Sequence, residues 1–302
     1  MLQNFCKKIS IICAFFFLSP SAHRAGADQI RREFPLHRAQ TEFVLTFFFV
    51  SYIIGKVSEL GWETMLDFAS VCASGEKQEN HDHLGILEES YCACFAVSDG
   101  KALPHIAELA VRTVLADFKE QSEITTATMP RFLEHAQKEL ESYQLQCAIP
   151  GGAAAAVLLT DGELAVWAHI GDCRIYHLQD RLLYEITADH SDAYARYEAG
   201  NIRYPKIRTD RTRRSLTHLL GLNQDFAPIF SSPAMVRKND SFLICTDGFW
   251  ENIHEREIEK TLKRSKNAKD WLHRMEKIVE KNRASGKYTK ILDDYSAITV
   301  CI

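Results

Sequence analysis

The chain has 302 residues, of which 46% are hydrophobic and 25% are charged, and its formal net charge at pH 7 is −4. This ordinary globular composition argues against an intrinsically disordered protein, and the slightly negative charge gives no reason to expect a nucleic-acid partner. The nine cysteines include no CxxC pair, and their odd number and loose spacing indicate neither a zinc ribbon nor a disulfide framework. We therefore expect the main domain to fold in a reducing compartment.

Residues 1–64 are expected to form a hydrophobic N-terminal leader or anchor, separate from the rest of the chain. Residues 1–27 have a basic start, an apolar run and a small-residue AGA, as a secretory signal does. The apolar run at 44–54 is shorter, in its strictly apolar part, than the roughly 20 residues that a bilayer requires. Two hypotheses stay open: residues 9–54 anchor the protein in a membrane, or Met65 is the true start and the preceding residues extend the reading frame upstream.

From residue 65 to 302 we expect one domain, which begins with two strands and two helices. MLDFASVCA (65–73) alternates weakly, as an edge strand does, and YCACFAVSD (91–99) is rich in strand-forming residues. Apolar residues recur at helical spacing in 106–118, and 130–144 has a proline in its first turn. Both of these later segments are therefore predicted to be helices.

A ladder of short strands is predicted in the middle of the chain. Its strands are GAAAAVLLT, ELAVWAHI, RIYHL and LLYEIT, separated by turns such as the one at Asp161-Gly162. After a polar segment rich in arginine (191–214) come the strand DSFLICTD, helices near 255–264 and 268–284, and the strand YSAITVCI. Antiparallel strands in succession, with helix pairs between groups of them, predict an α+β fold: a two-sheet antiparallel β-sandwich flanked by helices on both sides (α-β-β-α).

Carboxylates stand at the ends or beginnings of the predicted strands. They are Asp99, Asp172, Asp247 and the pair Asp293-Asp294. Because strand ends collect along one edge of a sandwich, these groups would repel each other and raise each other's pKa values unless cations lay among them. An all-oxygen set of ligands favours Mg²⁺ or Mn²⁺ over zinc. For a single Asp-Gly pair, such as Asp161-Gly162, an ordinary turn is the simpler interpretation, but the carboxylates together predict a metal centre.

Short motifs are also spread over residues 65–302, and their order along the chain is informative. They are NHD (80–82), AVSDG (96–100), Gly151-Gly152, HIGDCRIY (169–176), ITADHS (186–191), EAGNI (198–202), RRSLTHLLG (213–221), ICTDGFWENI (244–253) and DDYSAITVCI (293–302). The series resembles the metal-dependent protein serine/threonine phosphatases, the type 2C family, in its bacterial form. One such match would be weak, whereas this many matches in order are specific.

The resemblance implies that the protein hydrolyses phosphoserine or phosphothreonine in proteins, by means of a hydroxide that bridges two divalent ions. The cofactors would be Mn²⁺ or Mg²⁺, with two ions and, as in bacterial members, a third and weaker one. Asp99 would bridge both ions, and the carbonyl group of Gly100 would complete one site. Asp247 and Asp293 would hold the other site, and Asp172 with Asp247 would hold the third ion.

Three further positions take their expected roles from the same resemblance. Asp82 would act as a catalytic residue through metal-bound water. Lys77 stands where the family has the arginine that binds the substrate phosphate; lysine keeps the positive charge but loses the bidentate fork. Asp294 is the alternative to Asp293 as a metal ligand.

The chain departs from the family pattern around the expected metal centre. His81 replaces an acidic or amide residue, and KALPH (101–105) replaces a glycine-rich loop. Since two cations would repel Lys101, we expect it to point away from them or to meet the substrate phosphate. His105 is a candidate general acid, although a solvated loop histidine is the simpler interpretation. These departures leave a second hypothesis open, a weakened or inactive phosphatase-like module that binds a phosphoprotein or a kinase.

The expected partner is a phosphorylated protein, and the activity would oppose that of a serine/threonine kinase. We expect no bound nucleic acid, a monomer, and a catalytic domain in the cytoplasm. The arginines of 191–214 form either a docking surface for acidic or phosphorylated partners or a solvated basic segment.

Overall fold

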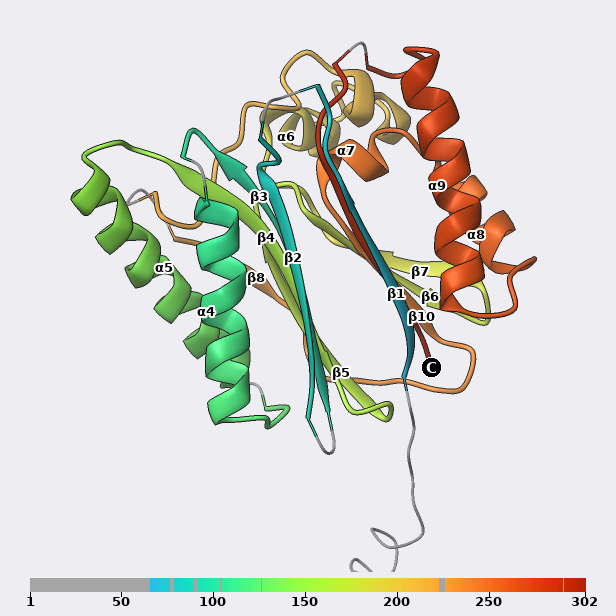
Figure 1. Ribbon diagram of the computed structural model, residues 1–302. Coiled ribbons are helices and arrows are strands. Elements are labelled where there is room, and N and C mark those ends of the chain that lie inside the picture. The colour runs from blue at the N-terminus through green and yellow to red at the C-terminus, as the bar shows by residue number, and fades with distance from the viewer. Residues whose placement is uncertain are drawn as a thin grey trace, which may run out of the picture. The chain divides into compact units, whose positions relative to one another are not determined.

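The computed structural model describes residues 66–302, apart from residues 77–78, 90–91, 104, 126, 223–225 and 290. The described residues form two antiparallel sheets that face each other, with helices on the outer side of each sheet (Figure 1). This arrangement confirms the predicted α+β sandwich. The hypotheses about residues 1–64 and about Lys77 concern residues outside the described part of the chain.

Both sheets are built from antiparallel pairs. The first sheet has five strands in the order β1-β11-β10-β6-β7. Its strands are β1 (Asp67–Ala73), β11 (Tyr295–Cys301), β10 (Ser241–Cys245), β6 (Arg174–Gln179) and β7 (Leu182–Ile186). The second sheet has six strands, in the order β2-β3-β4-β5-β8 with β9 also paired to β5. Its strands are β2 (Asp82–Glu88), β3 (Ala93–Lys101), β4 (Gly152–Thr160), β5 (Leu164–Ile170), β8 (Ile229–Phe230) and β9 (Ala234–Met235).

Two helices cover the outer face of each sheet (Figure 1). The helices on the second sheet are α4 (Ile106–Glu120) and α5 (Thr128–Cys147), and those on the first sheet are α8 (Glu255–Leu262) and α9 (Ala268–Ala284). The shorter elements are α6 (Asp192–Glu198), the 3₁₀ helix η1 (Tyr204–Thr209) and α7 (Asp247–Trp250). In the described part of the chain, no helix has both the length and the apolar character that crossing a membrane requires.

Strand β3 shows how the sequence supplies a core on both faces of a sheet. Successive side chains of a strand point to opposite faces. Ala93, Phe95 and Val97 pack between the two sheets, while Cys94 and Ala96 pack under the helices. A strand that is buried on both faces needs apolar residues at nearly every position, and this explains the unbroken apolar run before Ser98.

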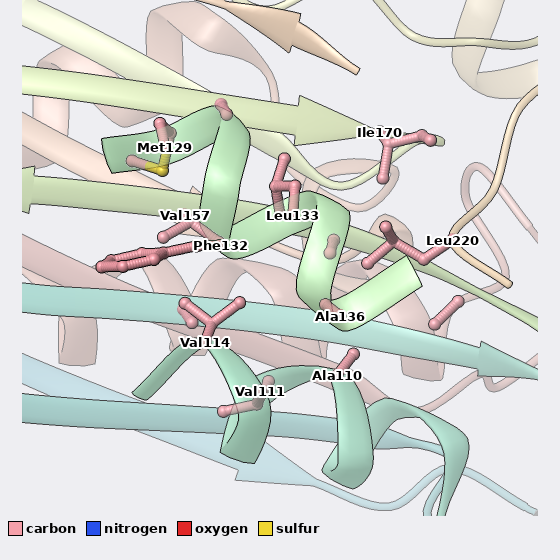
Figure 2. Close-up of a cluster of buried hydrophobic side chains, with 14 of the residues drawn as sticks. Ala110, Val111, Val114, Met129, Phe132, Leu133, Ala136, Val157, Ile170 and Leu220 are labelled. Carbon is pink, nitrogen blue, oxygen red and sulfur yellow. The ribbon is translucent and has the colours of Figure 1, made fainter. Parts of the chain in front are cut away.

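The helices over the second sheet meet it through one apolar stripe each. Figure 2 shows Val111 and Val114 of α4 and Phe132 and Leu133 of α5 gathered in one cluster with Val157 of β4. Buried side chains recur in both helices at spacings of three and four residues, which places them along one apolar stripe of each helix. The helical spacing noted in the sequence therefore marks the face that packs on the sheet.

Strand β2 was not predicted from the sequence. Its run DHLGILE has Gly85 at its centre, and most of its residues are half-buried. A Cβ atom at Gly85 would lie 2.5 Å from Leu115 Cδ1 and 2.6 Å from Val111 Cγ1. Glycine fits here because α4 packs directly on the strand, which is a tertiary constraint that local strand propensity does not contain.

A buried ion pair ties the start of β6 to the segment after β7. The guanidinium group of Arg174 donates to both oxygens of Asp189, from Nε at 2.7 Å and from Nη2 at 2.6 Å. The two side chains are 2% and 1% exposed. The same guanidinium lies 3.4 Å from the ring centroid of Trp250, and Trp250 Nε1 donates to the carbonyl oxygen of Asp172 at 2.9 Å. One buried cation thus holds the turn that carries Asp172 in place.

We expect Arg174→Leu to lower the free energy of unfolding by about 3–5 kcal/mol, because it leaves the Asp189 carboxylate buried without its partner. The measurement is urea denaturation followed by circular dichroism. The double variant Arg174→Leu/Asp189→Leu is the matched control, and it should be more stable than the single variant since no unpaired charge remains. A double variant less stable than the single one would contradict this account.

Candidate active site

Buried aspartates gather at strand ends next to α7, whose place in the sandwich is shown in Figure 1. We call this group the acidic edge, and it consists of Asp82, Asp99, Asp172, Asp247, Asp293 and Asp294. Asp82 and Asp99 are opposite each other in the β2–β3 pair of the second sheet. Asp172 precedes β6, Asp247 follows β10, and the last two precede β11, all next to the first sheet. The acidic edge therefore draws its members from both sheets.

The Asp-Gly pair that follows β10 is explained by a close backbone approach. A Cβ atom at Gly248 would lie 1.9 Å from the carbonyl oxygen of Asp294. Asp247 begins the short helix α7 and is itself buried. Only glycine lets the backbone pass this close, and the contact brings Asp247 beside the segment that carries Asp293 and Asp294.

Burial and mutual repulsion perturb the carboxylates of the acidic edge. Burial, together with the charge of Asp99, raises the pKa of Asp82 well above its usual value. Burial and the charge of Asp247 do the same to the pKa of Asp172. Burial also raises the pKa of Asp99 to about 6, with Lys101 opposing the increase and Asp247 adding to it. These effects show that carboxylates from both sheets lie within electrostatic reach of one another.

Lys101 points into the acidic edge; the expectation that it points away from two cations or meets the substrate phosphate concerns the protein with metal bound and stays a prediction. Its ammonium group donates to Asp99 Oδ2. Burial by itself would lower the pKa of Lys101, but the carboxylates of Asp99, Asp247 and Asp172 raise it well above its usual value. The reason is strand geometry: Lys101 follows Asp99 by two residues in β3, so both side chains project from the same face.

A second cation, Arg214, reaches the acidic edge from the segment before β8. Its Nη2 atom donates to Asp293 Oδ2 at 2.7 Å. Burial would lower the pKa of Arg214, whereas Asp247 and Asp293 raise it. The neighbouring Arg213 donates through Nε to Glu251, a buried carboxylate whose pKa burial and Asp247 raise to about 7 against the opposing effect of Arg213. Sequence reasoning had assigned neither arginine a partner at the site.

Several arginines of the segment 191–214 form ion pairs or hydrogen bonds with other residues of the protein. Arg196 Nη1 lies 2.8 Å from Asp210 Oδ2. Arg208 is buried and donates to the carbonyl oxygens of Trp250 at 2.8 Å and Ile253 at 2.6 Å. Together with the contacts of Arg213 and Arg214, these bonds show that several of the arginines stabilise the fold rather than form the solvated basic segment of one hypothesis.

The two adjacent aspartates before β11 have different contacts. Asp294 accepts hydrogen bonds from the backbone amides of Gly75 at 2.7 Å and His81 at 2.9 Å, and it thereby fixes the segment between β1 and β2. Asp293 accepts from Arg214, and its charge contributes to the raised pKa of Asp99. Both remain candidates for a metal ligand.

His81 and His105 lie in the two motifs that depart from the family pattern. His81 acts through its backbone, since its carbonyl oxygen accepts from the amide of Gly100 at 2.9 Å. The side chain of His105 is 74% exposed, and Nδ1 is 3.2 Å from Glu108 Oε2 on α4. No described contact connects the His105 imidazole to the acidic edge. The simpler interpretation, a solvated loop histidine, accords with this position.

The donor atoms of the acidic edge suit a hard divalent cation. Asp172 Oδ1 and Asp247 Oδ2 are buried, and neither has a hydrogen-bond partner among the residues that the structure describes. Buried carboxylate oxygens without a donor are costly, and oxygen-only ligands are those that Mg²⁺ and Mn²⁺ prefer. Among the residues that the structure describes, no three His, Cys, Asp or Glu side chains are already grouped as metal ligands. The residues thus fit such an ion in their chemistry, while Lys101 and Arg214 bind two of the carboxylates.

Comparison with known proteins agrees with this geometry. A family model described as "Protein phosphatase 2C" matches residues 73–293. The "Serine/threonine phosphatase stp" of Listeria monocytogenes is 24% identical over 200 residues, which cover 62% of this chain and 79% of that protein.

Solved structures show the same fold. The serine/threonine phosphatase Stp1 from Staphylococcus aureus superposes with a TM-score of 0.70 at 20% identity, covering 79% of this chain and 96% of that one. The catalytic domain of the serine/threonine protein phosphatase PstP, in complex with two manganese ions, gives a TM-score of 0.63 at 18% identity, covering 78% and 97% of the two chains. Since the family model spans well over half of the sequence, this chain belongs to the protein phosphatase 2C family.

Proposed function

We propose that the domain at 65–302 hydrolyses phosphoserine and phosphothreonine esters in proteins, with two Mn²⁺ or Mg²⁺ ions as cofactors. The observation that carries the proposal is the acidic edge, in which Asp172 and Asp247 each have a buried carboxylate oxygen that no described residue donates to. Family membership supports the same reaction, and the structural relative PstP binds two manganese ions. A third ion would use Asp172 and Asp247.

Each aspartate of the acidic edge would have its own role in binding metal ions or water. Asp99 pairs with Asp82 across β2 and β3 and lies within the electrostatic influence of Asp247 and Asp293, so it would contact both ions, together with the carbonyl group of Gly100. Asp247 and Asp293 would complete the second position. Asp82 accepts a hydrogen bond from Thr246 at 2.6 Å, which fixes its carboxylate opposite Asp99 for binding and orienting water. When bound, the ions would supply Lewis-acid activation of water and would stabilise charge on the phosphoryl group.

The biological role that follows is the reversal of phosphorylation by a serine/threonine kinase, with a phosphoprotein as the substrate. A phosphatase-like module that binds phosphoproteins without hydrolysing them is the second candidate. The contacts of Lys101 with Asp99 and of Arg214 with Asp293 favour that candidate, because they neutralise two carboxylates without any metal ion. Catalytic measurements separate the two.

For Asp247→Asn we expect at least about a 100-fold loss of Mn²⁺-dependent hydrolysis of p-nitrophenyl phosphate and of a phosphothreonine peptide, since a central ligand is lost. Asp161→Asn is the matched control, because Asp161 also precedes a glycine but accepts hydrogen bonds from the backbone amides of Glu163 and Leu164 in the β4–β5 turn. That variant should keep its activity. Hydrolysis that ignores metal or survives Asp247→Asn would contradict the mechanism.

The pair Asp293→Asn and Asp294→Asn distinguishes the two candidate ligands. If Asp293 is the ligand, Asp293→Asn should weaken Mn²⁺ binding by at least about tenfold in isothermal titration calorimetry. Asp294→Asn should mainly lower the thermal midpoint, because it weakens the anchor of Gly75 and His81. The reverse outcome would assign Asp294 as the ligand.

In the presence of a chelator, we expect the free energy of unfolding to fall by on the order of a few kcal/mol between about pH 5 and about pH 8. Asp99 and Glu251 have pKa values raised to about 6 and about 7 in the folded protein. An acid with a raised folded-state pKa stabilises the fold below its unfolded pKa, and this contribution is lost as the pH rises through the folded value. Urea titrations at each pH measure the trend, and Mn²⁺ should restore stability at the upper end. A free energy of unfolding that rises between these two pH values would contradict the prediction.

A further inference from the structure

Lys101 and Arg214 approach the acidic edge from different parts of the chain. Lys101 ends β3 and binds Asp99 of the second sheet, while Arg214 precedes β8 and binds Asp293 beside the first sheet. The charges of Asp247 and Asp293 both act on Asp99 of the opposite sheet. The two cations therefore hold carboxylates that the proposed function assigns to metal ions.

Both cations are more exposed to solvent than the carboxylates that they bind. The side chains of Lys101 and Arg214 are each 35% exposed, whereas those of Asp99 and Asp293 are 5% and 12% exposed. Each long side chain can therefore leave its carboxylate by rotating outward, while the carboxylates stay where they are. The neighbouring Arg213 donates to Glu251 and so ties this segment to the end of α7.

We propose that Lys101 and Arg214 are tethered counter-ions of the acidic edge, which a divalent ion must displace in order to bind. This inference rests on the metal site of the proposed function. An ammonium or guanidinium group and a divalent ion compete for the same carboxylate oxygens, and a tethered group competes at a high effective concentration. The protein consequently folds stably without metal, and it binds metal more weakly than the same carboxylates would alone.

This competition gives a physical reason for the lysine that departs from the family pattern at position 101. The position after the Asp99-Gly100 pair carries a charge that opposes metal binding, and the segment before β8 carries a second one. Loading with metal then depends on the concentration of free divalent ion, so the protein is active only where that concentration is high enough to displace both side chains.

The test measures Mn²⁺ binding to the full chain by isothermal titration calorimetry, together with the thermal midpoint in a chelator. Lys101→Met and Arg214→Met remove the charges and keep apolar stems, and each should tighten the dissociation constant by at least about tenfold. Each should also lower the chelated protein's midpoint by several degrees. Lys101→Arg keeps the charge and should change the constant by less than about threefold. Lys119→Met, at an exposed position in the last turn of α4, is the remote control.

The outcomes separate the inference from the function on which it rests. If the wild type binds Mn²⁺ and both methionine variants bind it equally well, the counter-ion role is overturned while the metal site stands. Tighter binding without a lower chelated midpoint would also overturn it, since the side chains would then not stabilise the metal-free fold. If neither wild type nor variants bind Mn²⁺, the proposed metal site fails and the inference fails with it. Circular dichroism identifies a misfolded variant, in which case the other position decides.

Discussion

The structure is governed at one end by the need to neutralise buried carboxylates that belong to two different sheets. Asp82 and Asp99 come from the second sheet, while Asp172, Asp247 and Asp293 belong to the first. Apolar packing holds the sheets together elsewhere, but here like charges would push them apart. A hydroxyl group bridges part of the gap, since Thr246 donates to Asp82 and also accepts from the amide of Ser296. Cations must supply the rest, whether as ions from solution or as side chains.

Most of the architecture could be predicted because local patterns and tertiary packing agree. The apolar spacing of α4 and the continuous apolar run of β3 reflect how many faces of each element are buried. Strand β2 was missed because its central residue, Gly85, is set by the helix above it and not by strand propensity. Likewise, the chain turns into α7 at Asp247 because the backbone of Asp294 passes beside Gly248, a contact between segments distant in sequence.

The sequence was enough to predict which carboxylates meet at the candidate site. It was not enough to predict that Lys101 and Arg214 bind them. Aspartates at strand ends are brought together by any sandwich of this kind, so their convergence follows from topology. The directions of Lys101 and Arg214 depend on which charges lie nearby in the folded chain, and a long flexible side chain has no intrinsic preference among them. One signal was available for Lys101, because its spacing of two from Asp99 in a strand places both side chains on one face. Arg214 had no comparable signal within the polar segment around it.

The contacts of Trp250 affect the intrinsic fluorescence of the protein. Its indole ring lies beneath the guanidinium group of Arg174, and its N–H group is bonded to the backbone of Asp172. Indole emission responds to nearby charge and to hydrogen bonding of the N–H group. A rearrangement of the turn at Asp172 should therefore change the intrinsic fluorescence of the protein, so that occupancy of this region can be followed in real time without a label.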